Sequence, residues 1–121
     1  GIKMGSCDFY ETGIGKDVDE AFDKAVKNAQ YESGHGGYTG TIAEKNEYII
    51  INYKPPHTLP RKEFEYAEKL ISEDDKRINN KWGPAGAIRL AGKSLENYKL
   101  KFNSNIKKDE EVWLFFGWAS C

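Results

Sequence analysis

A glycine-rich run at residues 34–40 contains residue types that could bind an anion. It reads Gly-His-Gly-Gly-Tyr-Thr-Gly. Glycines let backbone N–H groups approach an anion closely, and the side chains of His35, Tyr38 and Thr39 would add hydrogen-bond donors. The run lacks the lysine and the following helix of a phosphate-binding P-loop. A simpler interpretation is a helix end followed by a glycine turn into a strand, because glycines often end helices.

Two later segments also combine glycine with aromatic side chains. The first is Trp82–Gly86 (WGPAG), which leads to Arg89. Tryptophan offers a face for stacking, and arginine offers a bidentate clamp for a carboxylate or phosphate. The second is Phe115–Ser120 (FFGWAS), in which the glycine could mark a bulge or the close approach of a ligand. Burial of these aromatic side chains in the core would explain both segments without any ligand.

The residues that could support catalysis or hold a metal form no recognisable motif. Cys7 and His35 could form a thiol–imidazole pair, but no nucleophile elbow or orienting acid accompanies them. His35, His57 and a carboxylate could bind a metal, but their spacing matches no known zinc motif. Glu44 and Glu47 flank an expected turn and are interpreted as solvated carboxylates. We therefore assign no catalytic residue, expect no metal and no cofactor, and leave enzyme activity open.

The composition is that of a globular domain rather than of a disordered tail. The chain has 121 residues, of which 39% are hydrophobic and 31% are charged, and this predicts one domain over residues 4–121. Residues 1–3 are interpreted as a cloning remnant. The formal net charge of −1 argues against nucleic acid as a partner, because phosphate binding favours basic proteins.

The two cysteines, Cys7 and Cys121, are too few for a disulfide framework, although a single bridge between the termini is conceivable. We find no secretory signal, and the longest apolar stretch, Val112–Phe116, is far too short to cross a bilayer. The sequence therefore predicts free thiols in a reducing cytoplasm and no membrane association.

Hydrophobic periodicity predicts an α+β fold: a mainly antiparallel sheet of about six strands with two helices, in the order β-α-β-β-α-β-β-β. The clearest helix begins at Asp17, with Glu20 as its capping-box partner, and ends near Ser33–Gly34. The second helix begins near Pro60. The expected strands are Ser6–Thr12, Tyr38–Lys45, Glu47–Tyr53, Ala85–Ala91, Tyr98–Phe102 and Val112–Trp118. The third and the last of these are apolar on both faces, which predicts central positions in the sheet.

Three runs carry a resemblance to known proteins. They are Gln30–Lys45 (QYESGHGGYTGTIAEK), Lys81–Gly86 (KWGPAG) and Phe115–Ser120 (FFGWAS). Together they resemble small proteins encoded by bacteriophages, prophages and some bacteria, over most of the chain after the first strand. The resemblance implies an origin in phage or prophage and action in the bacterial cytoplasm, without a catalytic assignment. It also implies a role against host defence, either by binding a defence protein or by sequestering a nucleotide signal.

These observations predict a non-enzymatic binding module for a small anionic, nucleotide-like ligand. The predicted ligand-binding residues are His35, Gly36, Gly37, Tyr38, Thr39, Trp82 and Arg89. Two alternatives remain: a protein–protein inhibitor of a host enzyme that acts through an aromatic face, and a small enzyme with His35 as general acid or base. A strand such as Tyr98–Phe102 at a sheet edge could also pair across a homo-oligomer.

Overall fold

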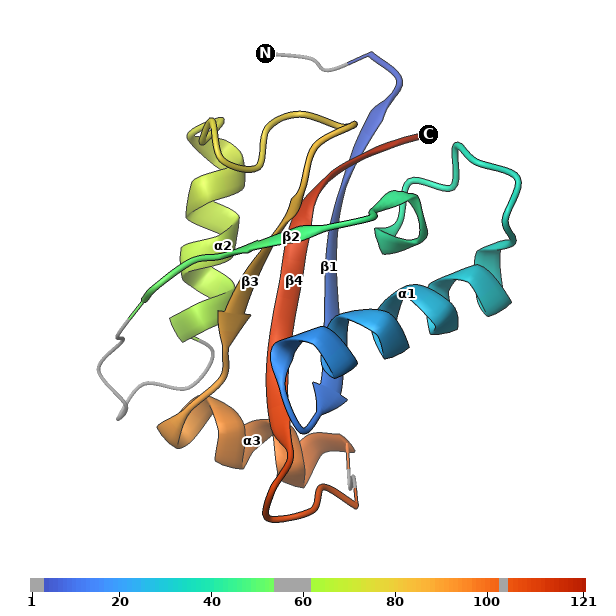
Figure 1. The fold of residues 1–121 in the computed structure, drawn as a ribbon. Coiled ribbons are helices and arrows are strands. Elements are labelled where there is room, and N and C mark those ends of the chain that lie inside the picture. The colour runs from blue at the N-terminus through green and yellow to red at the C-terminus, as the bar shows by residue number, and fades with distance from the viewer. Residues whose placement is uncertain (1–3, 54–61, 103–104) are drawn as a thin grey trace.

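The computed structural model describes residues 4–53, 62–102 and 105–121, which form a mixed four-stranded sheet and three α-helices (Figure 1). In chain order the elements are β1 (Ser6–Gly15), α1 (Val18–Ser33), the short 3-10 helix η1 (Ile42–Glu44), β2 (Tyr48–Ile50), α2 (Lys62–Ser72), β3 (Ala85–Arg89), α3 (Gly92–Phe102) and β4 (Glu111–Ser120). The strand order is β1-β4-β3-β2. Strand β4 is antiparallel to both of its neighbours, whereas β2 is parallel to β3.

The sheet separates two hydrophobic layers. Helix α1 packs on one face, and α2 and α3 pack on the other (Figure 1). The central strand β4 supplies side chains to both layers, because successive residues of a strand point to opposite faces. Phe115 packs on the α1 side and Phe116 on the α2 side, and neither is exposed. The prediction of a strand at Val112–Trp118 in the middle of the sheet is confirmed.

Helix α1 lies unusually close to β1 because both contacting surfaces are made of very small residues. Ala21, Ala25 and Ala29 form the buried stripe of the helix. A Cβ atom built on Gly13 would lie 2.3 Å from the carbonyl oxygen of Ala21, and one on Gly15 would lie 2.6 Å from the Ala21 nitrogen. The sequence predicted a first strand that ends at Thr12, just before these two glycines. That expectation was wrong: β1 continues through Gly15, and the glycines let the helix backbone approach.

The first predicted helix is confirmed. The Asp17 side chain accepts a hydrogen bond of 2.9 Å from the Glu20 amide, which satisfies a free N–H group of the first turn. The helix ends at Ser33, where Gly34 adopts φ 88° and its amide caps the Gln30 carbonyl. The predicted second helix corresponds to α2, and the predicted strand at Ala85–Ala91 corresponds to β3.

The predicted sheet of about six mainly antiparallel strands with two helices was wrong. Residues 38–45 form a loop and η1 instead of a strand, because Thr41 caps η1 by accepting a 3.1 Å hydrogen bond from the Ala43 amide. Tyr98–Phe102 belongs to α3 rather than to a strand. Tyr98 and Phe102, four residues apart, contact each other with ring centroids 4.7 Å apart, while Leu100 between them is 83% exposed.

The segment Glu47–Tyr53 also differs from its prediction. Its strand, β2, is short and lies at an edge of the sheet rather than in the middle. Ile49 and Ile50 are 37% and 47% exposed, so the apolar character of this segment does not reflect burial on both faces. The expectations for residues 1–3, His57 and Pro60 concern positions outside the described residues.

Among the residues that the structure describes, none of the helices has both the length and the apolar character needed to cross a membrane.

Candidate functional site

The three glycine- and aromatic-rich runs meet at one rim of the sheet. The Gly40 amide donates a 2.8 Å hydrogen bond to the carbonyl of Ser120, which joins the first run to the end of β4. The rings of Tyr38 and Trp82 lie 6.5 Å apart, which joins the first run to the second. The sequence could not show whether these runs converge, and the fold brings them together although they are far apart in the chain.

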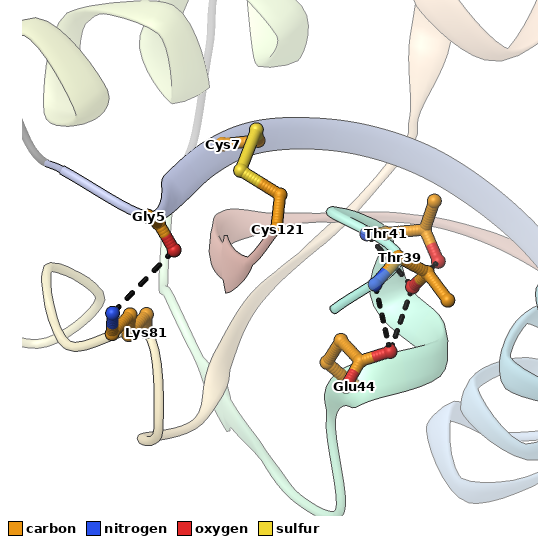
Figure 2. The surroundings of a disulfide bond; sticks show 7 residues. All are labelled: Gly5, Cys7, Thr39, Thr41, Glu44, Lys81 and Cys121. Atoms are coloured by element: carbon orange, nitrogen blue, oxygen red, sulfur yellow. Dashed lines mark hydrogen bonds between the residues drawn. A yellow bond between two sulfur atoms is a disulfide. The ribbon is translucent and has the colours of Figure 1, made fainter. Parts of the chain in front are cut away.

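A disulfide lies under this convergence. Cys7, near the start of β1, is bonded to Cys121, and the two are separated by 114 residues in sequence (Figure 2). Gly40 packs directly on the bridge: a Cβ atom built there would lie 3.1 Å from the Cys121 Cβ and 3.2 Å from the Cys7 Cβ. The prediction of free thiols was therefore wrong. The prediction of a cytoplasmic location rested partly on free thiols, and it loses that support.

The loop before η1 is fastened by a carboxylate. Glu44 accepts hydrogen bonds from the Thr39 amide, at 3.2 Å, and from the Thr39 hydroxyl, at 2.7 Å (Figure 2). The hydroxyl groups of Thr39 and Thr41 lie 2.8 Å apart. Glu44 was interpreted from the sequence as a solvated carboxylate, but it has a positioning role here. It holds the loop in a conformation in which Tyr38 has φ 59°, a left-handed value that is uncommon outside glycine.

Lys45 connects the first run to the second from inside the protein. It is only 3% exposed, and its ammonium group donates to the carbonyls of Asn80 (3.3 Å), Lys81 (3.2 Å) and Gly83 (2.9 Å). Burial lowers the pKa of Lys45 to about 8. The three hydrogen bonds gather the carbonyls of the turn that carries Trp82, so Lys45 fixes the position of this aromatic side chain.

The surface above this clamp is aromatic and exposed. Tyr38 is 68% exposed and Trp82 is 66% exposed, with their ring planes at 85°. The Lys81 ammonium group lies 5.4 Å from the centre of the Trp82 ring and 3.5 Å from the Gly5 carbonyl. We call Tyr38, Lys81 and Trp82 the aromatic rim. Perpendicular packing of this kind is favourable for aromatic pairs, but it leaves most of both rings in contact with water.

The predicted binding residues divide between two ends of the molecule. His35, Gly36 and Gly37 are exposed in the loop that carries Tyr38 and Thr39, and Trp82 lies beside Tyr38. Arg89 is at the opposite end of β3 from the Trp82 turn, where its guanidinium group forms a 3.2 Å ion pair with Glu111. The fold therefore gathers the loop residues with Trp82 and places Arg89 elsewhere.

The thiol–imidazole pair that the sequence suggested is not present at this rim. In the described structure Cys7 is in the disulfide, so it has no thiol with which His35 could form a reactive pair. The described ranges contain no group of three or more His, Cys, Asp or Glu residues arranged to hold a metal ion. Sequence reasoning missed the roles of Glu44, Lys45 and Lys81. The only available signal was their position inside the two runs. Lys45 and Lys81 bond to backbone carbonyls distant in sequence, and Glu44 bonds to Thr39 only because the loop folds back on η1.

Comparison of the chain with protein-family models, with curated proteins and with solved structures found no match.

Proposed function

We propose that this chain is a non-enzymatic domain that binds a partner protein through the aromatic rim. The observation that supports this proposal is the exposure of Tyr38 and Trp82 side by side. Tryptophan and tyrosine are among the residues most enriched at the energetic centres of protein interfaces. Large aromatic side chains usually bury much of their area, so exposure of two adjacent ones needs an explanation.

The rim is also held in place before any partner binds. Lys45 fixes the turn of Trp82, and Glu44 fixes the loop of Tyr38. The disulfide supports the same loop at Gly40. A surface that is already ordered loses little conformational entropy on binding, which favours affinity. These positioning contacts are what a binding surface requires, and they are hard to explain for a loop with no role.

The charge beside the rim indicates the chemistry of the partner. The Lys81 ammonium group forms no ion pair with any carboxylate in the described part of the chain. A partner that presents an apolar side chain flanked by Asp or Glu would cover the rings and pair with this lysine. The resemblance to phage and prophage proteins suggests a bacterial host protein, and binding of such a protein would give a role against host defence.

The proposal is tested by comparing Trp82→Ala with Tyr31→Ala in quantitative affinity enrichment from bacterial lysate. Tyr31 is a matched control because it is an aromatic residue, 91% exposed, that lies on α1 rather than at the rim. We expect at least one host protein to be retained by the wild type and by Tyr31→Ala and lost with Trp82→Ala.

The binding constant of that protein, once purified, provides the quantitative test. Truncation of an aromatic interface anchor costs at least about 2 kcal/mol, so its Kd should rise by about thirtyfold or more for Trp82→Ala. Equal thermal unfolding temperatures of the two variants would show that folding is not responsible. If Trp82→Ala retains the same host proteins as the wild type, the assignment of the aromatic rim as a binding surface is refuted.

A small anionic ligand is the second candidate, and one observation favours it. The backbone amides of residues 35–38 donate to no acceptor within the described residues, so they are free to bind an anion. Two observations oppose it: the Glu44 carboxylate occupies the adjacent Thr39 amide, and Arg89 is distant. Native mass spectrometry of the purified protein tests it directly. A stoichiometric nucleotide-sized adduct lost in Trp82→Ala would favour the ligand, and a clean apo mass would favour the protein partner.

A further inference from the structure

Among the residues that the structure describes, no strand pairs with the outer edge of β1. Strand β1 is ten residues long and terminates the sheet (Figure 1). On β4, the carbonyls of Ser120 and Val112 accept hydrogen bonds from Gly40 and Leu90 on the side away from β1. Backbone groups alternate in direction along an antiparallel strand, so the even-numbered residues of β4 point away from β1 and the odd-numbered ones toward it.

The register then identifies the free groups on β1. Even-numbered residues of β1 pair opposite even-numbered residues of β4, for example Thr12 opposite Leu114. Such pairs are not hydrogen-bonded to each other, so the N–H and C=O groups of Tyr10, Thr12 and Ile14 point outward from the sheet. Glu11 and Gly13 point inward to β4. An added strand would therefore bond to Tyr10, Thr12 and Ile14 without disturbing any existing pair.

The two sides of this edge differ in chemistry. A groove of about 460 Å³ follows the edge between α1 and α3. On the α3 side it is lined by Tyr98 and Phe102, whose rings contact each other, and Phe102 is 56% exposed. On the α1 side it is lined by Glu11, Asn28 and Lys24, and the Lys24 ammonium group is already paired with the Glu20 carboxylate at 3.1 Å. A strand lying in the groove would alternate its side chains between an apolar surface and an acidic, polar one.

The charge on the α1 side selects the occupant. Glu11 and Glu32 make no ion pair within the described ranges. Burial, followed by the charge of Glu32, raises the pKa of the Glu11 carboxyl. A second copy of this chain paired through β1 would bring two further carboxylates to the same place, which is unfavourable. A Lys or Arg side chain would instead neutralise the existing pair.

We propose that the edge of β1 binds an extended segment of a partner protein in which basic and apolar side chains alternate. The segment adds as a fifth strand next to β1, with its basic side chains on Glu11 and its apolar side chains on Tyr98 and Phe102. This mode of recognition uses main-chain hydrogen bonds for affinity and alternate side chains for specificity. It requires neither the aromatic rim nor the partner proposed for it.

The test uses a synthetic peptide about eight residues long in which lysine and valine alternate, with a glutamate–valine peptide as the control. We expect the lysine–valine peptide to slow hydrogen exchange of the Tyr10, Thr12 and Ile14 amides, measured by NMR. The Glu11 and Gly13 amides, which already bond to β4, serve as the internal reference and should not change. Lack of protection with peptide at about 1 mM, or equal protection by the glutamate–valine peptide, would overturn the proposal.

Two protein variants separate the backbone and charge contributions. Thr12→Pro removes one outward N–H without removing a bond to β4, since proline is tolerated where a strand amide faces outward. Both Thr12→Pro and Thr12→Ala remove the 3.2 Å hydrogen bond between the Thr12 and Tyr98 hydroxyl groups, but only Thr12→Pro removes the N–H, so it should weaken binding of the lysine–valine peptide more than Thr12→Ala does. Glu11→Lys, which alters no backbone group, should lower the affinity for the lysine–valine peptide by about threefold to tenfold. If Glu11→Lys binds the lysine–valine peptide with unchanged affinity, the proposal of a basic partner segment is refuted. It is also refuted if the protein alone dimerises and protects the same amides.

Discussion

Reduction of the disulfide between Cys7 and Cys121 should remove a large share of the stability of this fold. The bridge closes a loop spanning 114 residues of sequence separation. In the chain-entropy treatment, a cross-link that closes a loop of about 100 residues disfavours the unfolded chain by about 4.7 kcal/mol. A domain of this size has a free energy of unfolding of about 5–15 kcal/mol. We therefore expect the reduced protein to fold, but with a much smaller margin.

The expected change is measured by urea unfolding of the oxidised protein, the reduced protein and the double variant Cys7→Ser/Cys121→Ser. With a slope of about 2 kcal/mol per molar urea, a loss of about 4.7 kcal/mol lowers the midpoint by about 2 M. The reduced protein and the double variant should unfold together, and reductant should not affect the double variant. The ladder between β1 and β4 keeps Ser6 opposite Ser120 without the bridge, so native circular dichroism should persist in all three.

Two results would refute this reasoning at different points. Titration of two free thiols in the folded, unreduced protein would show that the bridge does not form. A confirmed bridge whose reduction shifts the free energy of unfolding by less than about 1 kcal/mol would show that loop closure does not determine stability here.

Two further predictions concern packing and charge. Gly13→Ala should lower the free energy of unfolding by about 3 kcal/mol or more, because the new methyl group would overlap the α1 backbone. Gly36→Ala, at a site with open space, should be nearly neutral. Equal melting temperatures of the two variants would contradict the close approach of α1 to β1. Burial lowers the pKa of Lys45 to about 8, against about 10.4 in an unfolded chain. Between these values the unfolded chain binds more protons than the folded protein, so the free energy of unfolding should rise as the pH is raised from about 8 to about 10. Lys45→Met should abolish that rise, measured as the urea midpoint. An identical pH profile in the variant would refute the lowered pKa of Lys45.

Local sequence patterns were sufficient for one helix and one strand. Helix α1 was predictable because Asp17 provides its cap and the alanine stripe has helical spacing. Strand β4 was predictable because a short run that is apolar at every position is typical of a strand buried on both faces. The same criterion failed for Tyr48–Ile51, where an edge strand also carries exposed isoleucines. It failed because burial is a property of the sheet and not of the strand.

The period of a short segment did not decide between helix and strand. Tyr98, Leu100 and Phe102 alternate with lysines, as in a half-exposed strand, yet Tyr98 and Phe102 are also separated by one helical turn. The packing of α3 on β4 and α2 selected the helical spacing and left Leu100 in solvent. Gly13 and Gly15 were equally ambiguous. Glycine permits both a break and a close contact, and only the position of α1 distinguishes them.

By itself, the sequence determined which segments of the candidate site contain unusual residues, because glycine, tryptophan and tyrosine are visible without a fold. Tertiary structure alone decided which of them meet. It placed Tyr38 beside Trp82, placed Arg89 at the other end of β3, and joined Cys7 to Cys121. It also gave Lys45 its three backbone acceptors. These contacts join residues far apart in the chain, and those of Lys45 use backbone carbonyls that every residue type possesses, so no local pattern records them.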